Sequence, residues 1–146
     1  HPFISKKAPK TTGREAFGLN YARKIVNIGK ELHLSNEDII ATVTNFTAFT
    51  IVDAYQRFIR NKIDQIIISG GGSYNPTLIL MIKSYVKMLL GENVVVMILE
   101  QLGYSSDAKE AVAFAILAYQ TFKRRCNNVP QITGAKYSVI LGDITP

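Results

Sequence analysis

The segment that most constrains the fold is an apolar run that ends in three glycines. Gln65–Ser69 reads Q-I-I-I-S, the glycines follow at 70–72, and Asn75-Pro76 then opens a helical pattern. Because a short continuous apolar run suits a strand buried on both faces, we expect such a strand at 65–69. Proline costs no hydrogen bond in the first turn of a helix, so a helix is expected to start at 75–76.

The spacing of apolar residues predicts the elements on either side of this segment. Repeats of three and four residues indicate helices at about 15–32, 36–60, 75–89 and 107–125, and a second apolar run predicts a strand at 93–98. Ser35 or Asn36 is expected to cap the second helix, and Ser106 or Asp107 the last. This order favours an α/β fold, a mainly parallel sheet flanked by helices. The tail after residue 127 is mostly loop, with a short edge strand at 137–141.

Length, charge and hydropathy narrow the class of protein. The 146 residues suit a single domain. The net charge of +6 sits in clusters near the two ends without an aromatic ladder, so we expect no nucleic-acid partner. No apolar run approaches the ~20 residues of a membrane span, and the start does not resemble a secretory signal. With Cys126 as the one cysteine, a reducing cytoplasm is the expected location.

The glycine run is the first candidate for a ligand site. Glycines at the end of a strand let the backbone approach a ligand closely, and ligands of open α/β sheets bind beyond the carboxyl ends of strands. The run has neither the spaced glycines of a dinucleotide site nor the Gly-Lys-Ser/Thr of a P-loop. A simple tight turn remains the alternative.

The second candidate is the start of the last helix, where polar residues precede an almost wholly apolar stretch. Glu110 lies in that first turn, either to offset the helix dipole or to point into a cleft and accept hydrogen bonds from a sugar hydroxyl. Asp53, in the middle of a helix, is either functional or a residue facing solvent. His1 and His33 lie far apart, so no nucleophilic triad and no metal site is expected.

Four segments, in order along nearly the whole chain, carry a resemblance to a known family. The chain resembles the anhydro-N-acetylmuramic acid kinases, specifically their carboxy-terminal portion. The matching segments are His1–Phe3 through Thr12–Phe17, Ser69–Leu78 (S-G-G-G-S-Y-N-P-T-L), Leu102–Ala115 (L-G-Y-S-S-D-A-K-E-A-V-A-F-A), and Asn128–Ala135 with Val139–Gly142.

The resemblance implies a fold and a reaction. Members are similar to actin and hexokinase, with two ribonuclease-H-like domains around a cleft for ATP and sugar. They use ATP, with Mg²⁺, and water to open the 1,6-anhydro ring and phosphorylate the sugar during cell-wall recycling. By this resemblance, Gly70, Gly71, Gly72 and Asn75 lie at the nucleotide, and Glu110 faces the anhydro-amino-sugar substrate.

The same resemblance implies that parts of the enzyme lie outside this segment. The first phosphate loop and the aspartate that acts as general base belong to the preceding half of the family's chain, so no catalytic residue is assigned here. The missing Met at the start and the end at Pro146 favour a segment of a longer protein, inactive alone. The alternative is a non-catalytic Rossmann-like module that binds a nucleotide or sugar or mediates assembly. A bare strand edge makes a homodimer possible.

Overall fold

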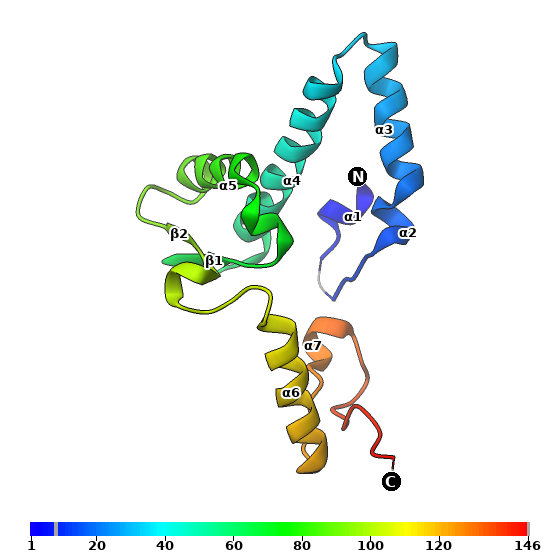
Figure 1. The fold of residues 1–146 in the computed structure, drawn as a ribbon, viewed down its shortest axis with the longest axis vertical. Helices are drawn as coiled ribbons and strands as arrows, with labels where there is room; N and C mark the ends of the chain where they lie inside the picture. Colours follow the sequence, from blue (N-terminus) through cyan, green and yellow to red (C-terminus); the bar gives the residue numbers. More distant parts are fainter. Residues whose placement is uncertain (8, 146) are drawn as a thin grey trace. The chain divides into compact units, whose positions relative to one another are not determined.

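A computed structural model describes residues 1–7 and 9–145, and this part of the chain divides into two compact units (Figure 1). The first unit holds residue 1 and residues 12–98. The second holds residues 2–7, 9–11 and 99–145. Within the described residues, no helix is long and apolar enough to cross a membrane.

The first unit is an α/β arrangement with a small parallel sheet. Strands β1 (Gln65–Ile68) and β2 (Val95–Ile98) pair in parallel, with Ile66 beside Val96. The remaining elements are helical: α2 (Arg14–Phe17), α3 (Leu19–Glu31), α4 (Asn36–Phe58), the short 3₁₀ turn η1 (Gly71–Tyr74) and α5 (Pro76–Leu89). The α/β class and the parallel pairing predicted from the sequence are confirmed.

The core of the first unit lies on one face of the sheet, where α4 and α5 pack. Its fully or almost fully buried side chains are Ala48, Val52, Ile66, Ile82 and Val86. Side chains alternate along a strand, so Ile67 and Val95 point to the other face, where they are 46% and 51% exposed. The prediction of a strand buried on both faces is therefore wrong for the first unit as described, because helices cover only one face.

The first two helices expected from the sequence are present, with one interruption. The helix predicted at 15–32 breaks between α2 and α3 at Gly18, where a Cβ would clash with the carbonyl oxygen of Arg14. The start of α4 is confirmed, because the Ser35 hydroxyl accepts a 3.0 Å hydrogen bond from the Asp38 backbone N–H. Helices α3 and α4 meet where Gly29 leaves room for Ile39.

Asp53, for which a solvent-facing position was one of two expectations, is buried. The residue is only 6% exposed, and its carboxylate accepts a 2.7 Å hydrogen bond from Nε of Arg57, one turn further along α4. A buried carboxylate needs such a partner because burial removes its hydration. The apolar neighbours of Asp53 in the sequence thus reflect a buried stretch of the helix.

The second unit is built around one helix that buries none of its residues. It contains α1 (Pro2–Ser5), the 3₁₀ turn η2 (Leu99–Leu102), α6 (Lys109–Phe122) and α7 (Pro130–Thr133). The sequence predicted an almost wholly apolar helix here, and within the second unit no residue of that helix is buried. Five of its large apolar side chains are 55–70% exposed: Val112, Phe114, Ile116, Tyr119 and Phe122.

Asparagine side chains, rather than an apolar core, hold the tail of the second unit against α6. Asn127 donates through Nδ2 to the Leu117 carbonyl at 3.1 Å and accepts at Oδ1 from the Leu141 N–H at 2.6 Å. Asn128 accepts from the Val139 N–H at 2.7 Å. The edge strand expected at 137–141 is absent from the described residues, because side-chain amides, and not a neighbouring strand, bind this backbone.

Candidate functional site

The glycine run forms a turn at the carboxyl edge of the sheet. Gly70 has a φ of +89°, in the left-handed region that favours glycine. Its carbonyl accepts two hydrogen bonds from Ser73, from the backbone N–H at 2.9 Å and from the hydroxyl at 2.7 Å. Ser73 is itself buried, being 5% exposed. Ser73 therefore stabilises the turn from its buried side, and the exposed side of the turn consists of Gly71 and Gly72.

Gly71 has no structural reason to be a glycine within the described residues. Its φ does not fall in the left-handed region, and a Cβ built on it would meet no heavy atom within 4 Å. At Gly72 a Cβ would make only an ordinary contact, 3.5 Å from Cδ2 of Leu78. The space above the turn is open, so a ligand could lie directly on the backbone there.

Asn75 begins the next helix. Its Oδ1 accepts a 3.1 Å hydrogen bond from the Leu78 N–H, and Pro76 occupies the first turn of α5, so the predicted helix start is confirmed. Because parallel strands end at the same edge, the turn after Ile68 and the chain leaving Ile98 begin side by side. Because Oδ1 caps the helix, the ligand-binding role expected of Asn75 would fall to its Nδ2 group.

Glu110 lies in the first turn of α6, exposed to solvent, in the second unit. The caps predicted for this helix are wrong. Ala108 occupies the cap position without a side-chain bond, and the nearest hydroxyl contact is that of Ser105, which accepts from the Ala108 N–H at 3.3 Å. Ser106 is instead buried. Glu110 and the glycine turn belong to different units, each described by itself.

Glu100 is a structural residue that the sequence reasoning missed. It is half-buried in η2, and its Oε1 accepts a 2.9 Å hydrogen bond from the Ser106 N–H, which shapes the loop leading to α6. The available signal was a carboxylate directly after an apolar strand. A charge at that place has to be satisfied by the loop that folds over it.

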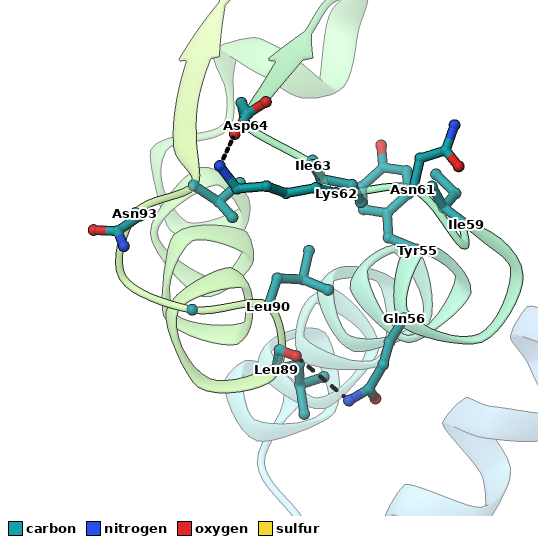
Figure 2. Close-up of a pocket in the computed structure, with 12 residues that line it drawn as sticks. Tyr55, Gln56, Ile59, Asn61, Lys62, Ile63, Asp64, Leu89, Leu90 and Asn93 are labelled. Atoms are coloured by element: carbon teal, nitrogen blue, oxygen red, sulfur yellow. Dashed lines mark hydrogen bonds and ion pairs between the residues drawn. The ribbon is translucent and has the colours of Figure 1, made fainter.

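A cavity lies at the opposite, amino edge of the sheet (Figure 2). It has a volume of about 340 Å³, with Ile63 and Leu90 among its apolar lining. Two of its lining residues, Lys62 and Asp64, pair with each other, Nζ to Oδ1 at 2.7 Å, and this hydrogen bond raises the pKa of the Lys62 ammonium. Neither the glycine turn nor Glu110 lines this cavity or two further ones of 350 and 360 Å³ in the described residues.

Among the described residues, no group of three His, Cys, Asp or Glu side chains could hold a metal ion. Cys126 is exposed and free. The arrangement thus offers two separate features for chemistry: an open glycine turn at the carboxyl edge of a parallel sheet, and an exposed carboxylate at the start of a helix.

These features define part of an α/β protein with an open glycine turn at the strand ends, and comparison with known sequences gives the family. A profile of the family described as anhydro-N-acetylmuramic acid kinase matches residues 1–146. The chain belongs to the anhydro-N-acetylmuramic acid kinase family.

Individual relatives agree with the family match. The chain is 52% identical over 147 residues to an anhydro-N-acetylmuramic acid kinase of Bacillus cereus (strain G9842), covering 99% of this chain and 37% of that one. It is 46% identical over 145 residues to one of Caldanaerobacter subterraneus subsp. tengcongensis, covering 98% and 35% respectively. The chain thus spans little more than a third of the length of these relatives.

Proposed function

We propose that this chain is the carboxy-terminal, nucleotide-binding portion of an ATP-dependent anhydro-N-acetylmuramic acid kinase. The kinase opens the 1,6-anhydro ring with water and transfers a phosphoryl group from ATP, giving N-acetylmuramic acid 6-phosphate in cell-wall recycling. Membership of the family and the names of the relatives support the reaction. A cytoplasmic location belongs to the proposal, because ATP is the phosphoryl donor.

The observation that carries the proposal is the open glycine turn. Gly71 is required neither by backbone conformation nor by packing within the described residues, and it lies where α/β sheets bind ligands. A nucleotide that lies against Gly70, Gly71 and Gly72 accounts for both facts, since any side chain at position 71 would occupy its space. Asn75, at the end of the turn, then lies within reach of the same ligand.

Glu110 is proposed to bind the sugar. It is an exposed carboxylate at the start of a 14-residue helix, which fixes its backbone while leaving its oxygens available to sugar hydroxyls. The catalytic base and the first phosphate loop come from the other half of the enzyme. Phosphoryl transfer depends on positioning and on charge stabilisation by Mg²⁺ around the phosphates. The segment alone is therefore expected to show no turnover.

The proposed whole fold is ribonuclease-H-like. The parallel sheet of the described residues has two strands and one bare face, which is too small for a complete sheet, because such domains need three or more strands and cover on both faces. The remaining strands and helices are expected from the rest of the kinase, with a homodimer as a further level of assembly.

Thermal protection of the full-length kinase by nucleotide tests this proposal. ATP with Mg²⁺ should raise the unfolding temperature, because a ligand that binds only the folded state stabilises it by mass action. The anhydro-sugar should then be phosphorylated at a measurable rate. GTP and AMP at equal concentration are the controls for adenosine and phosphate recognition. No shift with ATP, with or without Mg²⁺, would refute nucleotide binding.

A non-catalytic assembly module is the second candidate, favoured by the exposed apolar side chains of α6. The sequence before this segment separates the two. A glycine-rich phosphate loop and an aspartate after an apolar strand support the kinase, and a preceding region with neither supports the module.

A further inference from the structure

The first turn of α6, which carries Glu110, is not held by packing within the second unit. Among the described residues of that unit no residue of α6 is buried, and Ala108 at the cap position makes no side-chain hydrogen bond. A helix start depends on packing or on a cap to satisfy its first backbone N–H groups. The direction of the Glu110 carboxylate therefore depends on the loop that precedes the helix.

Glu100 accepts hydrogen bonds in this loop both with its backbone and with its side chain. Its carbonyl accepts from the Gly103 N–H at 3.0 Å, and its Oε1 accepts from the Ser106 N–H at 2.9 Å. Gly103 has a φ of +81°, which favours glycine and lets the chain turn at this point. Glu100 thus closes the loop of residues 100–106 onto itself.

Burial makes the bond between Glu100 and Ser106 difficult to replace. Ser106 is 5% exposed, Glu100 is half-buried, and the Oε2 atom of its carboxylate is buried. A charged acceptor forms a stronger hydrogen bond than a neutral one. A buried N–H that loses its acceptor suffers the full cost of desolvation. Removal of the Glu100 carboxylate should therefore shift the backbone at Ser106.

Ser106 connects Glu100 to the turn that carries Glu110. The Ser106 carbonyl accepts a 3.4 Å hydrogen bond from the N–H of Lys109, which is the first residue of α6 and directly precedes Glu110. Ser106 therefore binds Glu100 through its N–H and the helix start through its carbonyl. A shift of the backbone at Ser106 also moves the first turn of α6.

We propose that Glu100 is a positioning residue for the kinase reaction. Through Ser106 it holds the first turn of α6 so that the Glu110 carboxylate meets the hydroxyl groups of the anhydro-sugar. Glu100 itself does not contact the substrate, because Oε1 is bonded to the loop and Oε2 is buried. A residue that binds a substrate needs such support, since a small misplacement weakens its contacts steeply. The inference rests on the proposed function of Glu110.

Steady-state kinetics of the full-length kinase test the inference. Glu100→Ala should raise the KM for the anhydro-sugar about tenfold, while the KM for ATP stays within about twofold of the wild type. Glu100→Gln keeps an oxygen that can accept from Ser106 and should restore most of the sugar affinity. Ser106→Pro, which removes the donor instead, should act like Glu100→Ala and replaces it if that variant does not fold. Loss of kcat with both KM values unchanged would indicate fewer folded molecules and overturn the inference.

A double-mutant cycle shows whether Glu100 acts through Glu110. Adding Glu100→Ala to Glu110→Ala should lower kcat/KM for the sugar by less than about a further twofold, because both changes act on one contact. Asp107→Ala, which removes an exposed acid near the same helix start, is the matched control and should not couple to Glu110→Ala. Losses that multiply in the Glu100 and Glu110 double variant would overturn the positioning role.

Amide exchange on the same full-length proteins separates this inference from the proposed function. The Ser106 N–H should exchange at least about tenfold faster in Glu100→Ala than in the wild type, with Glu100→Gln close to the wild type. That result, with unchanged sugar kinetics in Glu110→Ala, would refute the sugar role of Glu110 and leave the bond from Glu100 to the helix start standing. A sugar effect of Glu110→Ala with none of Glu100→Ala would overturn the inference and leave the proposed function standing.

Discussion

Helices α5 and α6 have the same length and are equally apolar on average, yet only one of them is buried. Helix α5 is packed beside α4 and buries Ile82 and Val86. Helix α6 buries nothing within its unit, and its tail is attached by asparagine amides. An apolar helix is therefore buried only where another surface packs against it. The first unit contains that surface, and for α6 it is not found among the described residues of the second.

The largest expected effect contrasts the two helices directly. In the 146-residue chain, Ile82→Ala should lower the free energy of unfolding by about 2–5 kcal/mol, the usual cost of a cavity in a packed core. Phe114→Ala, which truncates a side chain that is 69% exposed, should change it little. Urea unfolding followed by circular dichroism measures both. Equal losses would show that α6 has its own packed core and would break the comparison.

The same pair of variants in the full-length kinase sharpens the comparison. If the rest of the chain covers α6, Phe114→Ala should become as costly as Ile82→Ala, about 3–5 kcal/mol for a buried phenylalanine. If Phe114→Ala is as stable as the wild type in both the 146-residue chain and the full-length kinase, the exposed face of α6 packs against a different partner.

The next effect concerns the turn in the first unit. In the full-length kinase, Gly71→Val should raise the ATP concentration needed for half-maximal activity at least about tenfold, which corresponds to roughly 1.4 kcal/mol of binding. Stability should be unchanged, because a Cβ at this position meets nothing within 4 Å. Gly71→Ala is the graded control, with a smaller rise. Nucleotide affinity that is the same in all three proteins would discard the role assigned to the turn.

Glu110 is the corresponding test in the second unit. Glu110→Ala should reduce turnover of the anhydro-sugar about tenfold while changing ATP affinity much less, because its carboxylate is proposed to contact the sugar. Asp107→Ala removes a neighbouring exposed acid near the same helix start and should leave both quantities unchanged. Steady-state kinetics with each substrate varied in turn provide the measurement. Small, equal effects of the two substitutions on both substrates would favour a role in offsetting the helix dipole.

The smallest effect is a pH dependence at Glu15. The Glu15 carboxylate accepts hydrogen bonds from its own backbone N–H and from the Gly13 N–H, the latter at 2.6 Å to Oε1. These bonds lower the pKa of the carboxyl group from 4.5. A carboxyl group whose pKa is lower in the folded state than in the unfolded state stabilises the fold at pH values above its unfolded-state pKa. This stabilisation is lost as the pH falls through its folded-state pKa. Glu15→Gln should remove this small loss of stability at acid pH. Unfolding midpoints compared between about pH 3 and pH 6 measure it. A variant with the wild-type profile would show that the bonds do not persist in solution.

Features that depend on neighbours in the sequence were predictable. The strand, glycine turn and helix at 65–89 follow from an apolar run, residues with special backbone preferences and an asparagine cap, all of which act within a few residues. The cap expected at Ser35 is present, and Asn75 caps the helix that was expected to start at 75–76. At α6 the same reasoning failed, because Ser106 turns inward and donates its N–H to Glu100, a contact set by how the loop folds.

The sequence by itself determined the order of elements, the parallel α/β class and the position of an open glycine turn at a strand end, because these depend on local backbone preferences and on the period of the apolar residues. The tertiary structure decided which apolar faces are buried. Asp53 is enclosed beside Arg57 while Ile67 and Phe114 stay exposed, against what hydropathy alone indicates. Burial is a property of two surfaces in contact, and a single segment of sequence describes only one of them.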